Sequence, residues 1–236
     1  MGQLVWIASY PKSGNTWMRA FLHNYIRNAE TPHDINRLTD LTAADINAER
    51  YQRYDPRPAS QYGIADVQRM RPLVHRDLTE LDSTLVFVKT HNARMQVAGA
   101  PLITPAMTAG AVYIVRDPRD IAISYSRHRG RSLDETIAFM AHPQAATGGT
   151  DTKVFEFLSN WSTHVNSWTN TSDPRVQVVR YEAMASDPTA VFGAVIGWLG
   201  QAPAAERLQR AIRFSAFEEL QIQEKTSGFR ERTVES

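Results

Sequence analysis

The stretch LVWIASYPKSGNTW, residues 4–17, decides how the chain is expected to fold. Its apolar run, residues 4–8, has the length and composition of a buried strand, and Tyr10-Pro11 ends that run. The polar loop of residues 12–16 (KSGNT) then leads into apolar residues at helical spacing. A strand, a tight loop with a glycine and a helix in this order direct several backbone N–H groups and the positive end of the helix dipole at one point. The stretch therefore predicts an anion site, most often a site for phosphate.

The composition is that of an ordinary globular protein. The 236 residues are 42% hydrophobic, and 26 Lys and Arg against 25 Asp and Glu leave a net charge of +1. A chain so close to neutral has no field for nucleic acid or an anionic membrane surface, so we expect neither partner, and any anion binding should be local. The sequence contains no cysteine, which excludes disulfides and thiolate metal sites. No stretch approaches the roughly 20 apolar residues of a membrane span, and no signal peptide precedes the first strand, so we expect a cytoplasmic protein.

Two more apolar runs are typical of strands buried on both faces: residues 84–88 (TLVFV) and 111–115 (AVYIV). Residues 177–179, in VQVVRYE, are a last candidate strand. A helix should begin at Pro118 with Asp117 as its cap. The other expected helices run from the opening loop to about residue 28 and over residues 41–54, 63–78, 133–141, 154–168, 188–199 and 207–223. Strands that alternate with helices predict a single α/β domain over residues 1–236, with a central parallel sheet of four to five strands and helices on both faces.

A basic residue follows each of the four expected strands. These residues are Lys12, Lys89, Arg116 and Arg180. Ligands of parallel sheets bind at the carboxyl ends of the strands. Four cations at this edge of a nearly neutral protein therefore predict a ligand with more than one negative group.

The opening loop differs from the P-loop of nucleotide triphosphatases. Its lysine precedes its glycine, and the first glycine of G-x-x-x-x-G-K-[ST] is missing. Such enzymes also need a carboxylate after a strand to help hold Mg²⁺, whereas two of the strands here end in Lys89 and Arg116. We therefore expect no metal site. Transfer without a metal is easier for a group with one negative charge than for one with two, which favours sulfuryl over phosphoryl transfer.

Three further residues are candidates for chemistry at this edge. His91 lies two residues beyond Lys89, where a neutral imidazole could take a proton from an attacking hydroxyl, and an ordinary surface histidine is the alternative. Ser124 lies about two helical turns beyond Arg116 and could join it around an anion, although spacing alone favours a helix-surface serine. Trp17 ends the loop and could stack on a purine or equally pack in the core.

Four blocks of sequence resemble motifs of the cytosolic-type sulfotransferases, which use 3′-phosphoadenosine 5′-phosphosulfate (PAPS). YPKSGNTW at residues 10–17 resembles the 5′-phosphosulfate loop of that family, and VYIVRDPRDIAISY at 112–125 resembles its 3′-phosphate motif. FVKTH at 87–91 is similar to the segment with the catalytic histidine, and RYEAMASDP at 180–188 is similar to the Tyr-Glu-x-Met segment beyond it. The blocks occur in family order and cover most of the chain from residue 4 to about residue 200.

The resemblance implies a sulfotransferase that moves a sulfuryl group from PAPS to a hydroxyl, less commonly an amine, of a small acceptor. Lys12 would lie near the bridging oxygen where leaving-group charge develops. Lys89 would neutralise the sulfuryl oxygens. His91 would deprotonate the acceptor for in-line attack.

The resemblance also implies a set of PAPS-binding residues. Five from the opening loop would hold the 5′-phosphosulfate, an arginine and a serine would hold the 3′-phosphate, and three aromatic residues would border the adenine. In this order, the residues are Lys12, Ser13, Gly14, Asn15 and Thr16, then Arg116 and Ser124, then Trp17, Tyr181 and Phe217. Phe217 follows Ser215-Ala216, where the family has Thr-Ser, so Ala216 departs from the pattern.

The end of the chain departs further from the family. The basic Arg-Lys-Gly-x-x-Gly segment that closes over the 3′-phosphate has no match, and residues 228–232 resemble the stretch just before it. We therefore expect either a truncated chain or one without this clamp, and in both cases weakened PAPS affinity.

Two other functions stay open at this point: a Mg²⁺-dependent kinase or NTPase, and an adenylate-binding module without transfer activity. The acceptor and the oligomeric state also stay open. The expected walls of the acceptor site are residues 31–80, 92–110 and 145–150.

Overall fold

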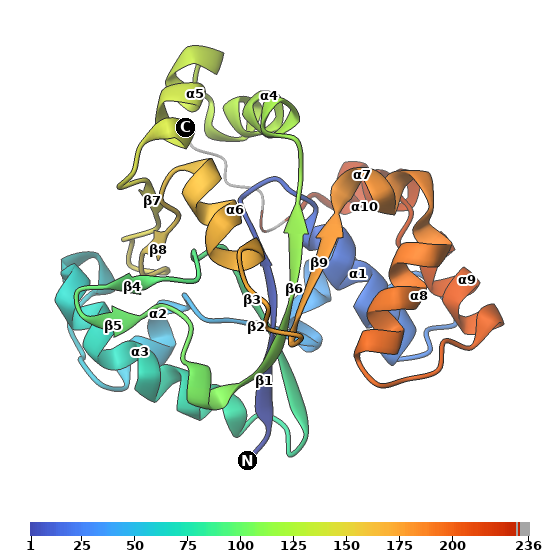
Figure 1. Ribbon diagram of the computed structural model, residues 1–236, viewed down its shortest axis with the longest axis horizontal. Coiled ribbons are helices and arrows are strands. Elements are labelled where there is room, and N and C mark those ends of the chain that lie inside the picture. Colours follow the sequence, from blue (N-terminus) through green and yellow to red (C-terminus); the bar gives the residue numbers. More distant parts are fainter. Residues whose placement is uncertain (230, 232–236) are drawn as a thin grey trace.

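The protein is organised around a five-stranded parallel sheet with strand order β2-β3-β1-β6-β9 (Figure 1). The structure is a computed structural model that describes residues 1–229 and residue 231. The strands of the sheet are β1 (Gln3–Ser9), β2 (Thr42–Ala44), β3 (Leu85–Thr90), β6 (Thr108–Val115) and β9 (Val176–Arg180). The expected α/β fold with a parallel sheet is confirmed. Because β1 pairs with β3 on one side and β6 on the other, it lies in the centre, which is why its apolar run is unbroken.

The remaining elements connect these strands. The α-helices are α1 (Asn15–Ile26), α2 (Ala48–Gln52), α3 (Ile64–Thr79), α4 (Pro118–Arg129), α5 (Leu133–Ala141), α6 (Trp161–Thr169), α7 (Tyr181–Ser186), α8 (Pro188–Trp198), α9 (Ala205–Phe214) and α10 (Phe217–Ser227). Three short 3-10 helices are η1 (Ile35–Asp40), η2 (Ala59–Gln61) and η3 (Pro105–Met107). Two small hairpins pair β4 (Gln96–Val97) with β5 (Ala100–Pro101) and β7 (Ala146–Thr147) with β8 (Glu156–Phe157).

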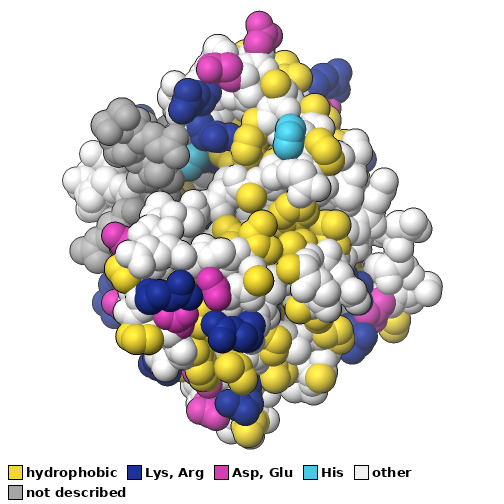
Figure 2. All heavy atoms as spheres, turned by 90° about the vertical axis from the view of Figure 1, so that its left-hand side faces the viewer, with side chains coloured by type: hydrophobic (Ala, Val, Ile, Leu, Met, Phe, Trp, Pro, Cys, Tyr) yellow, Lys and Arg dark blue, Asp and Glu magenta, His cyan; other side chains and the backbone are white. Residues whose placement is uncertain are grey.

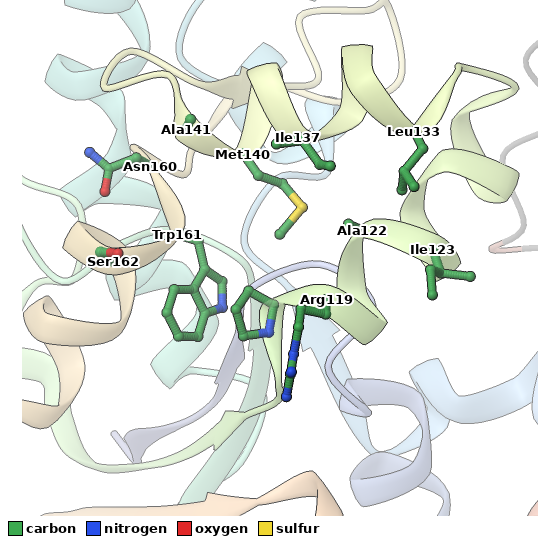
Figure 3. Close-up of a pocket in the computed structure, with 11 residues that line it drawn as sticks. Arg119, Ala122, Ile123, Leu133, Ile137, Met140, Ala141, Asn160, Trp161 and Ser162 are labelled. Carbon is green, nitrogen blue, oxygen red and sulfur yellow. The ribbon is translucent and has the colours of Figure 1, made fainter.

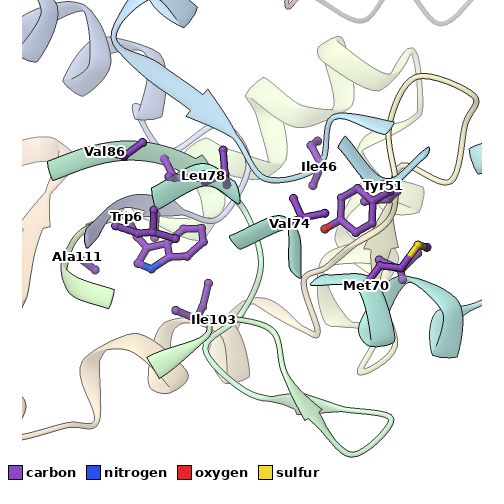
Figure 4. Close-up of a cluster of buried hydrophobic side chains, with 14 of the residues drawn as sticks. Trp6, Ile46, Tyr51, Met70, Val74, Leu78, Val86, Ile103 and Ala111 are labelled. Atoms are coloured by element: carbon purple, nitrogen blue, oxygen red, sulfur yellow. The ribbon is translucent and has the colours of Figure 1, made fainter. Parts of the chain in front are cut away.

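Helices cover both faces of the sheet, and the alternation along β1 divides the core between them. Val5 and Ile7 pack with residues of α1, α7, α8 and α9 on one face. Trp6 lies on the other face among Leu78, Val86, Ile103 and Ala111 (Figure 4), in a cluster that also includes residues of α3 and Trp168 of α6. Each face therefore buries its own apolar layer, and the carboxyl edge of the sheet stays available for polar residues.

The expected helix over residues 41–54 is wrong for residues 42–44 and correct only for residues 48–52, where α2 lies. Thr42, Ala43 and Ala44 form the edge strand β2, in register with Phe87, Val88 and Lys89 of β3. The side chain of Asn47 then accepts a hydrogen bond from Glu49 N and caps the short helix α2. Pairing with β3 thus overrides the helical pattern of this stretch.

Two other expected helices have different bounds. Over residues 154–168, the first part is extended, because Val154 N donates to Ile46 O and β8 pairs with β7, and α6 begins only at Trp161 behind its Asn160 cap. The expected helix over residues 207–223 is two helices, α9 and α10. The backbone turns between them at Ala216, where ψ is 150°.

The surface shows charges of both signs. On the face drawn in Figure 2, basic and acidic side chains lie interspersed, and hydrophobic side chains gather near its middle. This mixture agrees with the net charge of +1. Among the residues that the structure describes, no helix combines the length and the apolar character needed to cross a membrane. The expectation of one domain over residues 1–236 stays a prediction, and residues 230 and 232 of the stretch that resembles the family's C-terminal segment lie outside the described residues.

Candidate active site

The carboxyl ends of the parallel strands point to one edge of the sheet, where α4 and α7 begin (Figure 1). The loop with Lys12 follows β1, and Lys89 and His91 lie at the end of β3. Arg116 follows β6, and Tyr181 is the first residue after β9. The topology therefore gathers residues from four separate parts of the sequence at the edge where ligands of α/β sheets bind.

The loop after β1 is a tight turn with two residues in left-handed conformations, Lys12 with φ 66° and Gly14 with φ 102°. Asn15 ties the loop to the strand, because its Nδ2 donates to Ile7 O at 2.9 Å. Gly14 is the N-cap of α1 and has no side chain to satisfy the first N–H groups of the helix. Within the described part of the chain, the fully buried Ser13 hydroxyl also has no hydrogen-bond partner. Unpaired donors at a helix N-terminus fit an anionic group such as a phosphosulfate.

A second group of residues forms around Tyr181. The Arg116 guanidinium lies over the Tyr181 ring, with Cζ 4.1 Å from the ring centroid, and Trp17 meets the same ring edge-on at 5.7 Å. Arg116 Nη1 also donates to Lys12 O at 3.0 Å, which joins this group to the opening loop. The buried Arg116 Nε has no partner among the described residues. An arginine and a tryptophan that both contact one tyrosine ring, with a guanidinium donor left over, suit an aromatic base and a phosphate.

Two other predicted donor-binding residues, Ser124 and Phe217, take no part in the contacts described above around Tyr181. Ser124 lies half-buried on α4, whose expected cap is confirmed because the Asp117 carboxylate accepts from Arg119 N at 2.9 Å. Phe217 is the first residue of α10 and is 58% exposed. The Arg180 side chain is 73% exposed beside Glu182. Arg180, the basic residue at the end of β9, therefore faces solvent, whereas the other three basic residues join the contacts at the sheet edge.

His91 is held in one orientation and one tautomer. Its Nδ1 is 2.8 Å from Ser9 O, and since a carbonyl only accepts, Nδ1 must carry the proton. The Nε2 lone pair is then available to another proton donor. Burial, together with the charge of Lys89, lowers the pKa of His91 to about 3, so the imidazole is neutral at physiological pH. A neutral, oriented imidazole is what a general base requires.

Several residues that were not among the predicted site residues hold the backbone around His91. His91 N donates to Glu156 Oε1 at 2.7 Å, and His91 O lies 3.0 Å from His164 Nε2. Burial raises the pKa of Glu156 to about 7. The fully buried Asp45 accepts from Arg71 Nη1 at 3.2 Å and from Asn92 Nδ2 at 3.1 Å. No periodicity or motif in the sequence marks these residues, because their partners lie far away along the chain.

Lys89 is also part of an unexpected ion-pair network. Its Nζ is 3.0 Å from Glu231 Oε2, and both Nη atoms of Arg19 contact the same carboxylate, at 2.8 and 2.9 Å. Burial tends to raise the pKa of Glu231, but Lys89 and Arg19 outweigh it and hold that pKa well below its usual range. The Glu231 carboxylate is therefore ionised and lies between the two cations, Lys89 and Arg19.

An apolar cavity of about 630 Å³ lies between α4, α5 and the start of α6 (Figure 3). Met140 and Trp161 point into it, and Pro118 and Arg119 of α4 are among its lining residues. Its lining includes none of the predicted catalytic or donor-binding residues. The cavity is therefore distinct from the group around Lys12, Lys89 and His91.

Curated relatives of the chain are sulfotransferases. The luciferin sulfotransferase of Photinus pyralis is 22% identical over 222 residues, which cover 91% of this chain and 55% of the relative. Sulfotransferase 1E1 of Mus musculus is 24% identical over 229 residues, which cover 91% of this chain and 64% of the relative. The chain thus spans between 55% and 64% of the length of these relatives.

Solved structures share the fold at low sequence identity. Retinol dehydratase in a complex with retinol and PAP is 21% identical with a TM-score of 0.61, and the match covers 96% of this chain and 70% of that one. Mouse sulfotransferase SULT7A1 complexed with PAP is 17% identical with a TM-score of 0.59, and the match covers 92% and 65%. The sulfotransferase domain family matches residues 3–232, nearly the whole chain, and the protein therefore belongs to that family.

Proposed function

We propose that the protein transfers a sulfuryl group from PAPS to a hydroxyl, less commonly an amine, of a small acceptor. The observation that carries this proposal is the orientation of His91. Its Nδ1–H donates to Ser9 O, so that Nε2 can accept a proton beside Lys89. Membership of the sulfotransferase domain family supports the reaction type.

The unpaired donors of the site support the assignment of PAPS. The 5′-phosphosulfate would lie on the N-terminus of α1, held by Lys12, Ser13, Gly14, Asn15 and Thr16. The 3′-phosphate would take Arg116 and Ser124. The adenine would lie against Trp17 and Tyr181, with Phe217 as an outer contact.

In the reaction we propose, the acceptor oxygen attacks sulfur in line with the bridging oxygen. The acceptor proton passes to His91 Nε2, the new S–O bond forms, and the bond from sulfur to the bridging oxygen breaks, leaving 3′,5′-adenosine bisphosphate. Lys12 would stabilise the charge on that bridging oxygen, and Lys89 the charge on the sulfuryl oxygens. The pKa of His91 is low in the free protein, so binding of PAPS must raise this pKa for His91 to accept a proton. The negative charge of PAPS has this effect because it stabilises the imidazolium.

The experiment compares wild type and His91→Ala with radiolabelled PAPS and a panel of hydroxyl acceptors. We expect turnover by wild type and a loss on the order of 10²- to 10⁴-fold in His91→Ala, because the general base is removed. His142→Ala, which removes an exposed histidine at the end of α5, should leave turnover unchanged. Full turnover in His91→Ala would exclude His91 as the base.

The same assays separate the two alternatives. ATP turnover that EDTA abolishes, without PAPS binding, would establish a Mg²⁺-dependent kinase or NTPase instead. Tight binding of 3′,5′-adenosine bisphosphate without transfer to any acceptor would establish a non-catalytic adenylate-binding module. A cytoplasmic location is also a proposal, and the cysteine-free sequence is compatible with it.

A further inference from the structure

Glu231 joins two cations that come from distant parts of the chain. Arg19 lies on α1, its side chain is only 1% exposed, and its Nε donates to Thr42 Oγ1 at 2.8 Å. Its two Nη atoms hold the Glu231 carboxylate, which is 212 residues away in sequence. The same carboxylate accepts from Lys89 Nζ at 3.0 Å. One carboxylate thus bridges a buried guanidinium and the ammonium group at the end of β3.

The two cations differ in how firmly they are fixed. Arg19 is buried and uses all three guanidinium nitrogens, so a carboxylate paired with two of them is held in a defined place. Lys89 carries its charge on a flexible four-carbon stem and is 21% exposed. Glu231 is therefore the fixed group of the Lys89 pair.

The pairing leaves Lys89 able to bind an anion. An ammonium has three N–H donors, and Glu231 takes one of them. Lys89, Glu231 and Arg19 together keep a net charge of +1, so the site still attracts a negative group. A second possibility is that the carboxylate competes with the donor for Lys89, which would make Glu231 inhibitory.

We propose that Glu231 is a positioning residue that holds Lys89 for the sulfuryl oxygens, and that Arg19 fixes Glu231. This inference rests on the proposed role of Lys89 in sulfuryl transfer. It is favoured over inhibition because a buried arginine holds the carboxylate in place, whereas an inhibitory group would have to leave when the donor binds.

The test measures kcat and KM for PAPS in Glu231→Gln. We expect kcat to fall on the order of 10- to 100-fold because Lys89 loses its anchor, with little change in KM, since the loop after β1 still binds the donor. Glu231→Gln also leaves Arg19 without an anion, so the double variant Arg19→Met/Glu231→Gln is measured beside it. The double variant should be more stable than Glu231→Gln but have the same low kcat. If Glu231 had a purely structural role, kcat would recover together with stability.

The matched control is Asp40→Asn, which removes a carboxylate from an exposed pair with Arg37 and should leave kcat unchanged. Unchanged or increased kcat in Glu231→Gln, with an active wild type, would overturn the inference. An inactive wild type would instead count against the proposed function. In that case crystal structures of wild type and Glu231→Gln decide, because the inference fails if Lys89 Nζ keeps the same position in both.

Discussion

Gly14 is the residue at which backbone conformation and the predicted donor site depend most directly on each other. Its φ of 102° is unfavourable for other residues, and a Cβ there would lie 2.7 Å from Tyr181 Cδ2. We expect Gly14→Ala to lower the free energy of unfolding by about 1–3 kcal/mol and to weaken binding of 3′,5′-adenosine bisphosphate, because the Tyr181 ring is displaced. Urea unfolding and calorimetric titration measure the two effects.

Gly99→Ala provides the matched control. Gly99 also has a positive φ, 80°, but a Cβ there would have no atom within 4 Å. Gly99→Ala should therefore show the backbone cost without any loss of nucleotide binding. If both variants bound the nucleotide as wild type does, the contact between Gly14 and Tyr181 would have no part in the site.

For individual residues, the sequence predicted which side chains gather at the sheet edge better than it predicted their protonation and orientation. Lys12, Lys89, His91 and Arg116 follow expected strands, and the structure brings them to one sheet edge. The tautomer of His91 could not be predicted, because it depends on Ser9 O, which is 82 residues away. Only the assembled sheet places that carbonyl beside the ring.

At the scale of elements, long-range pairing explains the errors. The stretches 41–54 and 154–168 both have partly helical patterns, yet they meet each other, since Val154 N donates to Ile46 O and Asn47 bridges to Lys153. A local pattern cannot reveal such a partner. The three inner strands, β3, β1 and β6, were predicted better, because burial on both faces gives them continuous apolar runs.

Asp45 offers a prediction at this scale, because it links three elements. It follows β2, pairs with Arg71 of α3, and accepts from Asn92 just beyond β3, all in a fully buried position. Asp45→Asn leaves the Arg71 charge buried without an anion, so we expect it to lower the free energy of unfolding by about 3–5 kcal/mol in urea titrations. Asp40→Asn, from an exposed pair, should cost about 0–1 kcal/mol. A similar small loss in both variants would contradict a structural role for the Asp45 pair.

At the scale of the whole molecule, the parallel sheet was predictable because alternation of strands and helices is a property of the entire chain. The contact of Lys89 with Glu231 was not, because the two lie 142 residues apart and no motif joins them. Polar groups that are buried by the overall fold, and that no local sequence pattern marks, also determine how stability depends on pH.

Five buried groups make stability depend on pH in opposite directions. Burial lowers the pKa of His23 to about 4, of His164 to about 4 and, with Lys89, of His91 to about 3. It also lowers the pKa of the fully buried His75. Below a pH of about 6.5, the pKa of histidine in the unfolded chain, these histidines bind protons in the unfolded chain but not in the folded protein. Their contribution to the free energy of unfolding is therefore lost as pH falls. Burial raises the pKa of Glu156 to about 7, so its contribution is present at low pH and is lost as pH rises from about 4.5 to 7.

The four histidines outweigh the single carboxyl group, which predicts a protein that is less stable in mild acid. A net difference of about three protons corresponds to roughly 4 kcal/mol per pH unit between about pH 5 and pH 6. Urea unfolding at several pH values between about 5 and 7 should therefore show the midpoint falling with pH. His23→Gln removes one of the four histidine protons and should reduce the slope by about 1.4 kcal/mol per pH unit. A midpoint that stays constant or rises as the pH is lowered would mean that these histidines are not held neutral by burial.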